Sequence, residues 1–163
     1  MGWFRKSEEE QLLKAIKQIG FRVTGVDDSK SGNPSLVYST GFHELFGQPE
    51  VIVFGLPMQG MAAMIGMLSD QCREGLRMTD GLQVAGLLAN HVCTLRTVKP
   101  ENIVDDYFHF AMWYRQRQTG TDMTDAFQIV WPGAKTGLFP WDAGCTDEVR
   151  ALQPALYESG QNS

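Results

Sequence analysis

The chain has 163 residues, 43% hydrophobic and 20% charged, which predicts one globular domain with a single core and argues against a disordered or fibrous chain. Its 19 acidic and 14 basic residues give a formal net charge of -5, which argues against a nucleic-acid or anionic-membrane surface, because both need clustered Lys and Arg. No apolar run approaches the length of a membrane span, and residues 1–10 are charged where a secretion signal would be apolar, so we expect a cytoplasmic protein.

The first predicted elements are a helix and a hairpin. Ser7 and Glu10 have the spacing of a capping box, and the apolar stripe that follows them predicts a helix over residues 8–19. Residues 21–26 alternate between apolar and polar side chains, as a strand with one buried face does. A polar stretch with glycine and proline comes next, so we expect residues 35–40 to return as an antiparallel partner.

The middle of the chain predicts a central strand and a methionine-rich helix. Residues 50–54 are nearly all apolar, which indicates a strand buried on both faces. Pro57 is typical of a first helical turn and the apolar spacing continues to Gly75, so we expect a helix whose methionines pack into the core. An adaptable binding surface is the alternative for these methionines. Residues 76–90 predict an irregular or partly helical connection, because two glycines interrupt any regular pattern.

The remaining third of the chain predicts two strands, two helices and an aromatic loop. In chain order they are a strand over residues 91–98, a helix opened by Pro100 and ended by Gly120, a strand over 127–131, a loop over 138–145, a helix over 147–156 and a frayed tail over 159–163. This order indicates an α+β fold, with an antiparallel or mixed sheet of about five strands and helices largely on one face. No internal repeat or linker composition divides residues 1–163, so we expect a single domain.

The cysteines and histidines show no pattern typical of a disulfide or metal site. Cys72, Cys93 and Cys145 are an odd number at wide spacing, so we expect reduced, mostly buried thiols, with a reactive cysteine as the alternative. His91 and His109 stand apart from any close ligand cluster, and therefore no metal site is predicted.

The end of the second predicted strand holds the densest group of reactive side chains. Tyr38, Thr40, His43 and Glu44 bring hydroxyl, imidazole and carboxylate groups together within seven residues. Histidine titrates near neutral pH and Glu44 can orient it, so His43 and Glu44 are the catalytic candidates, while Tyr38 and Thr40 would orient a ligand. A surface or hydrogen-bonded histidine without a catalytic role is the alternative.

Two tryptophans lie beside rigid turns after the last predicted strand. Trp131 precedes a proline, and Trp141 follows one and precedes Asp142. Tryptophan buries a large area and keeps one donor, which suits either a hydrophobic lid over the sheet or a concave surface for a ligand or partner. Asp142 would then either bond a turn amide or face a ligand beside Trp141.

Three blocks of the sequence resemble a bacterial family catalogued as domain of unknown function 4262. The first covers residues 20–26, the second runs from residue 34 to residue 57, and the third covers residues 130–142. In this order the blocks span most of residues 20–145. The resemblance implies a conserved fold over this range but no activity and no residue roles. The predicted helix over 8–19 and the residues after Cys145 lie outside it.

The sequence favours binding over catalysis. An acidic composition, a body rich in methionine and aromatic residues and the lack of a recognisable catalytic set indicate a non-catalytic protein-binding module of immunity or regulatory type. The alternative is a small-ligand-binding protein or an enzyme, with a pocket between the strand end at residues 38–44 and the loop at residues 131–142. A flavin is one such ligand, but no phosphate-binding cluster is present, so we expect no cofactor. The oligomeric state is left open.

Overall fold

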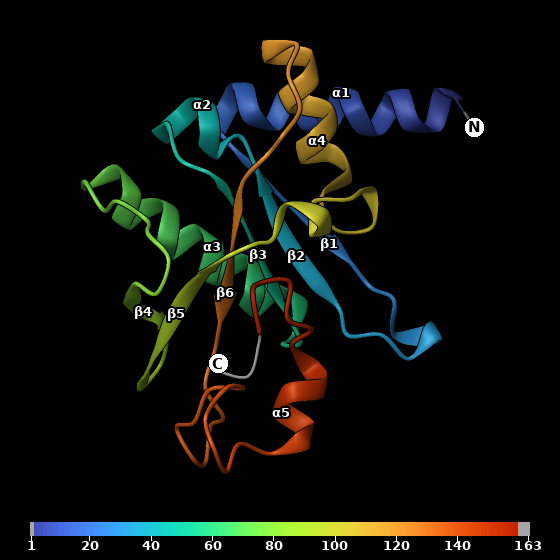
Figure 1. Ribbon diagram of the computed structural model, residues 1–163. Coiled ribbons are helices and arrows are strands. Elements are labelled where there is room, and N and C mark those ends of the chain that lie inside the picture. Colours follow the sequence, from blue (N-terminus) through green and yellow to red (C-terminus); the bar gives the residue numbers. More distant parts are fainter. Residues whose placement is uncertain (1, 160–163) are drawn as a thin grey trace.

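The computed structural model describes residues 2–159, which form a six-stranded mixed sheet with helices packed on both faces (Figure 1). Along the chain the elements are α1 (Gly2–Ile19), β1 (Arg22–Val26), the 3-10 turn η1 (Ser29–Ser31), β2 (Leu36–Thr40), α2 (Phe42–Phe46), β3 (Glu50–Phe54), α3 (Met58–Arg73), β4 (Gln83–Leu88), β5 (His91–Thr97), the 3-10 turn η2 (Pro100–Asn102), α4 (Asp105–Thr119), β6 (Ala126–Val130) and α5 (Asp147–Leu152). The strand order is β1-β2-β3-β6-β5-β4. Of the paired strands only β3 and β6 run parallel. The α+β class and the mixed sheet are therefore confirmed.

The sheet has six strands rather than about five because β4 forms within residues 76–90. This segment was expected to be irregular. Val84 and Leu87 both face the core although they are three residues apart, and the pairing register shifts in this part of the strand. Gly86, with φ of 88°, lies inside the shift. A bulge of this kind breaks the two-residue alternation by which strands are recognised, and for this reason β4 was not predicted from the sequence.

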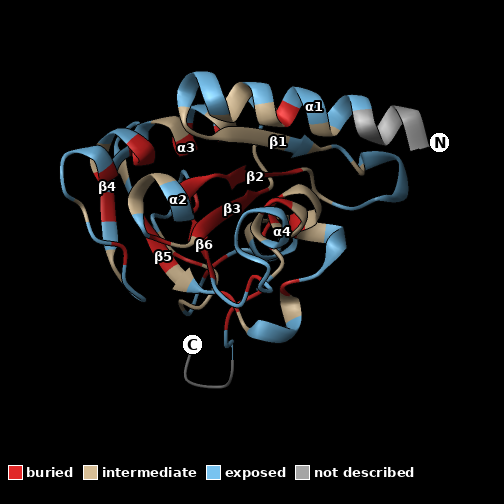
Figure 2. Ribbon diagram, turned by 90° about the horizontal axis from the view of Figure 1, so that it is seen from above, coloured by how far each residue is buried: buried red, intermediate tan, exposed pale blue. Residues whose placement is uncertain are grey.

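Alternating side chains of the central strands build a separate apolar cluster on each face of the sheet. Val51 and Val53 of β3 pack with α3 on one face, whereas Ile52 and Phe54 pack with α4 on the other. All five residues of β3 are buried, as predicted for a central strand, and β2, β3 and β6 form the buried middle of the molecule (Figure 2). Side chains of α2 and α5 join the α3 cluster. Most helices therefore lie on one face, as expected, but α4 occupies the other.

The methionines of α3 divide as its amphipathic spacing predicts. Met61 and Met64 are buried in the core, whereas Met67 is exposed on the outer face. Packing, rather than an adaptable surface, therefore accounts for the two inward-facing methionines.

The N-terminal helix differs from its prediction at its start. α1 begins at Gly2, so Ser7 lies inside the helix and does not cap it. Serine is tolerated in helix interiors, and the spacing of Ser7 and Glu10 is therefore not specific to a helix start. The predicted end is confirmed, because Gly20 has a φ of 104° and its N–H donates to the Ile16 carbonyl over 2.7 Å.

The C-terminal helix is shorter than predicted. α5 ends at Leu152, and residues 153–158 continue as an extended segment rather than as helix. Pro154 explains the difference, since the residue before a proline is disfavoured in the helical conformation. Residues 160–163 of the predicted frayed tail lie outside the described residues. None of the described helices combines the length and the apolar character that crossing a membrane requires.

Candidate functional site

The structure places the two predicted halves of the site at opposite ends of the sheet. Ser39, near the end of β2, donates to Glu50 at the start of β3, whereas Trp131 donates its indole N–H to the carbonyl of Phe54 at the end of β3. Four residues of strand, roughly 13 Å, separate these two positions. In Figure 1, α2 and the loop that follows β6 accordingly lie at different ends of the molecule. The pocket expected between residues 38–44 and residues 131–142 is therefore not formed.

Tyr38 and Thr40 are buried structural residues. The Tyr38 hydroxyl accepts the N–H of Phe110 over 2.9 Å, next to a kink in α4 where Phe108 leaves the helical conformation (φ -137°, ψ 30°). Burial raises the pKa of Tyr38, and the bond to Phe110 opposes that shift. Thr40 is fully buried, and its hydroxyl has no hydrogen-bond partner among the described residues. Neither side chain is exposed to a ligand.

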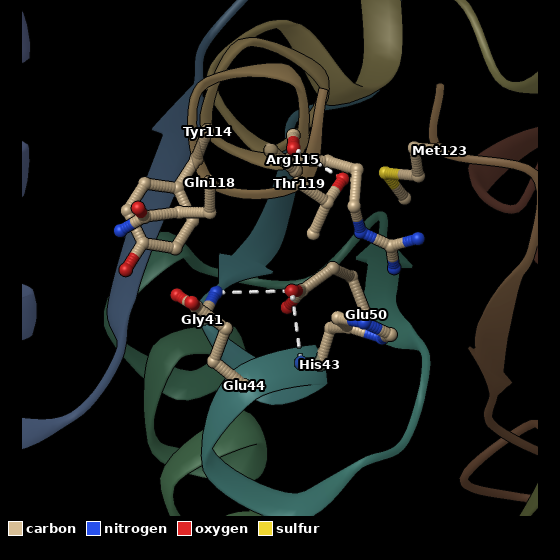
Figure 3. A pocket seen from close by; sticks show the side chains of 10 residues that line it. Gly41, His43, Glu44, Glu50, Tyr114, Arg115, Gln118, Thr119 and Met123 are labelled. Atoms are coloured by element: carbon tan, nitrogen blue, oxygen red, sulfur yellow. Dashed lines mark hydrogen bonds between the residues drawn. The ribbon is translucent and has the colours of Figure 1, made fainter. Parts of the chain in front are cut away.

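A buried carboxylate that the sequence analysis did not single out organises this end of the sheet. Glu50 is only 4% exposed. Its two oxygens accept hydrogen bonds from the Ser39 hydroxyl (2.7 Å) and from the backbone N–H groups of Gly41 (3.0 Å), Phe42 (3.1 Å) and His43 (3.4 Å). Burial raises the pKa of Glu50, and these four hydrogen bonds oppose the shift. The carboxylate therefore caps the first turn of α2, with two of the bonds visible in Figure 3.

Glu50 has little capacity left for a ligand. Oε1 accepts from Ser39 and Phe42, and Oε2 accepts from Gly41 and His43, so each oxygen already has two donors. A carboxylate offers about four acceptor positions in all. Glu50 is therefore a positioning residue. The only signal for it in the sequence was a charged residue opening a strand that is otherwise apolar.

His43 and Glu44 line a small polar hollow between α2 and the C-terminal half of α4 (Figure 3). Its polar and charged lining residues, after which we call it the polar hollow, are His43, Glu44, Glu50, Tyr114, Arg115, Gln118 and Thr119, although apolar atoms make up most of its exposed lining. The cavity volume is ≈ 10 Å³, room for about one water molecule. Burial raises the pKa of Tyr114, and a hydrogen bond to Glu44 raises it further. The predicted catalytic candidates are thus brought to one hollow, but without either tryptophan.

Trp131 is buried at the end of the sheet opposite α2, next to Phe54 at the end of β3. It is 5% exposed, and besides its indole bond to Phe54 its backbone N–H and carbonyl pair with the side-chain amide of Gln153 over 3.0 and 2.8 Å. All three polar groups are thus satisfied within the protein. Trp131 is therefore buried, and none of these three polar groups is free to bind a ligand.

Trp141 and Asp142 form part of an aromatic cluster at the same end. Trp141 stacks on Phe139 with ring centroids 5.0 Å apart, and the guanidinium of Arg96 lies 5.1 Å from the Trp141 ring. The Asp142 carboxylate accepts the N–H of Phe139 over 2.8 Å, which is the turn bond given above as one alternative. These contacts hold the loop in place and occupy one oxygen of the Asp142 carboxylate.

Two larger hollows lie on either side of Asn33 and Pro34 in the β1–β2 loop, and the sequence analysis did not anticipate them. The Tyr107 hollow has a volume of ≈ 370 Å³; its apolar lining includes Val26, Leu36, Phe54, Tyr107 and Pro154, and its carboxylates are Asp28 and Asp106. The Leu152 hollow has a volume of ≈ 480 Å³; its lining includes Leu56, Ala151 and Leu152, and its carboxylate is Glu148. Asn33 and Pro34 line both. We refer to the two together as the paired hollows.

The described cysteines and metal-binding residue types show no further reactive cluster. All three cysteines are buried and free, and burial raises the pKa of Cys93 to about 12, so its thiol stays protonated near neutral pH. Among the described residues, no group of three His, Cys, Asp or Glu side chains is arranged to hold a metal ion.

Comparison with known proteins identifies a family but no characterised relative. Neither a curated protein nor a solved structure matches the chain significantly. A family model, described as a domain of unknown function, matches residues 15–146. The match starts inside α1, ends immediately before α5 and includes all six strands of the sheet. The chain therefore belongs to the domain-of-unknown-function family DUF4262.

Proposed function

We propose that the protein is a non-catalytic protein-binding module of immunity or regulatory type, and that it binds its partner through the paired hollows. The observation that carries the proposal is that each hollow combines apolar lining residues with carboxylates. Asp28, Asp106 and Glu148 line the two hollows, and neither lining includes a Lys or an Arg. A cleft lined by one sign of charge attracts a partner of the opposite sign.

The shape of the paired hollows favours a peptide segment over a single small molecule. Small-molecule sites are normally one enclosed concavity, whereas here Asn33 and Pro34 border two separate hollows. An extended segment presents side chains at regular intervals and can place one in each hollow. The partner chemistry that fits is an extended segment with apolar side chains next to Lys or Arg.

The carboxylates of the paired hollows are available to such a partner. Asp28, Asp106 and Glu148 form no ion pair with any basic side chain in the described part of the chain. Asp28 accepts one hydrogen bond from the Asn33 side chain over 2.7 Å, which orders the loop and leaves the charge uncompensated. A basic partner would therefore gain ion pairs without breaking existing ones.

The test is affinity capture followed by binding measurements on variants. The immobilised full-length protein is used to capture partners from lysate of the source organism, and the recovered partner is purified. We expect Asp106→Asn with Glu148→Gln to weaken its binding roughly tenfold and to reduce the salt dependence. Glu44→Gln, which removes one carboxylate at the opposite end of the sheet, is the control and should leave binding unchanged. Equal binding by the double variant, or recovery of no stoichiometric partner, would overturn the proposal.

A further inference from the structure

The polar hollow contains an arginine that the fold leaves without a partner. Arg115 is half-buried on α4, yet its guanidinium makes no ion pair, ring contact or side-chain hydrogen bond with any described residue. Most other arginines whose side chains are described contact a carboxylate, a backbone carbonyl or an aromatic ring, namely Arg22, Arg73, Arg96, Arg117 and Arg150. Arg77 also lacks such a contact, but it is exposed to solvent.

The nearest buried carboxylate does not neutralise Arg115. Glu50 lines the same hollow, but its acceptor positions are filled by Ser39 and by the backbone of α2, and no Arg115–Glu50 ion pair forms. In Figure 3 the Arg115 side chain extends from α4 on the side where Glu50 and His43 lie. A guanidinium carries five donors in a planar fork that matches two oxygens of one anionic group. Arg115 thus offers an unused oxyanion-binding group to the hollow.

A second donor lies on the facing wall. His43 belongs to α2 and is exposed, and its imidazole makes no hydrogen bond or ion pair with any residue in the described range. The hollow is small, with a volume of ≈ 10 Å³. It has room for about one water-sized atom, so one oxygen of an oxyanion can enter it, whereas the rest of the anionic group and of any larger ligand would remain outside along α2 and α4.

We propose that the polar hollow binds an oxyanion, a carboxylate or phosphate group, with Arg115 as the main ligand-binding residue and His43 as a second donor. This site lies at the end of the sheet opposite the paired hollows and does not depend on them. Glu44 is the exposed carboxylate of the hollow and opposes an anion there. Removing its charge should therefore strengthen binding.

The experiment is an NMR titration of the full-length protein with sodium phosphate and, separately, sodium acetate, at constant ionic strength. We expect saturable shifts in the Arg115 side-chain Nε signal and in the backbone amides of α2. Arg115→Gln should weaken the interaction roughly tenfold or more, because hydrogen bonds to a charged group are lost. Arg115→Lys keeps the charge but loses the fork, so it should restore binding only in part.

Two controls make the titration decisive. Arg117→Gln removes the same charge two residues along α4, where the arginine stacks on Trp113, and should leave the affinity unchanged. Glu44→Gln should increase the affinity. Saturation by phosphate alone or by acetate alone identifies which oxyanion fits. Absence of a saturable shift with either salt, or equal affinity in Arg115→Gln and Arg117→Gln, would overturn the proposal, provided that the remaining signals of the variant show an intact fold.

Discussion

Glu50 illustrates how one buried charge is retained by local backbone donors. Removal of a carboxylate from water is unfavourable, and burial is the largest cause of its raised pKa. Its hydrogen bonds with Ser39 and three successive amides of the α2 start act in the opposite direction. Because these donors come from the segment between β2 and β3, Glu50 also fixes how the chain turns from one strand to the next.

The raised pKa of Glu50 has a defined effect on stability. The folded state takes up the proton at higher pH than the unfolded chain does, so the contribution of Glu50 to stability is largest at low pH. This contribution falls as the pH rises from the pKa of Glu50 in the unfolded chain, near 4.5, through its higher pKa in the folded state. In Glu50→Gln this dependence should disappear.

Urea unfolding of both proteins from about pH 4 to about pH 8 measures the effect. The Gln amide also leaves amide donors unpaired, which lowers the free energy of unfolding by about 1–3 kcal/mol at every pH. Glu50→Gln should therefore have the lower free energy of unfolding at low pH, and its difference from the wild-type protein should become smaller as the pH rises. Parallel pH profiles for the two proteins would contradict the assignment of the raised pKa to Glu50. Glu44→Gln controls for a change of one surface charge.

Helix α4 is held by a side chain from the strand beneath it. Its kink at Phe108 takes the Phe110 amide out of the regular helical pattern, and the Tyr38 hydroxyl accepts that N–H. The Tyr38 ring also lies edge-on to Phe108, with centroids 5.9 Å apart. The second part of α4, which carries Arg115 and Tyr114, is thereby positioned over β2.

Tyr38→Phe tests this support. The ring contacts remain while the Phe110 amide loses its acceptor, so the free energy of unfolding should fall by about 1–3 kcal/mol. Denaturant unfolding measures the change. Tyr107→Phe is the matched control, because the Tyr107 hydroxyl makes no hydrogen bond with any described residue, and it should cost less than about 0.5 kcal/mol. Equal losses in the two variants would show that the Tyr38 hydroxyl does not hold α4.

The whole molecule is closed at one end by a segment that lies outside the family match. Residues 147–158 follow the matched region and pack over the ends of β3 and β6. Gln128 holds this segment through its side-chain amide, which donates to the Pro154 carbonyl over 2.9 Å and accepts the Leu156 N–H over 3.0 Å. The closure is tight at Gly55, where an added Cβ would lie 2.4 Å from the Leu152 carbonyl oxygen.

Gly55→Ala should therefore be more destabilising than glycine geometry alone explains. Gly55 has a φ of 86°, and Gly47 has a φ of 67° with nothing within 4 Å of an added Cβ. Gly47→Ala should cost about 1–2 kcal/mol for the left-handed backbone, and Gly55→Ala should cost more because α5 must also move. Thermal and urea unfolding of both variants give the difference. Equal destabilisation would mean that α5 does not pack on Gly55 in solution.

Much of the fold follows from local sequence patterns. The alternation in residues 21–26, the continuous apolar run in 50–54 and the glycine after Ile19 each specified an element or its end correctly, because each pattern favours one local backbone conformation. Where a pattern was interrupted or ambiguous, as by Gly86 in β4 or by Ser7 inside α1, the boundary or the element was missed.

The candidate sites, by contrast, were decided by tertiary structure. Tyr38, Trp131 and Asp142 were site candidates by residue type alone, but each uses a polar group in a hydrogen bond inside the protein. The Trp131 bond to Phe54 spans 77 residues of sequence, and the polar hollow joins residues from α2 with Arg115 of α4. Local patterns determine which face of an element is buried. Which polar groups meet, and which charge is left without a partner, depends on contacts between elements that only the assembled sheet brings together.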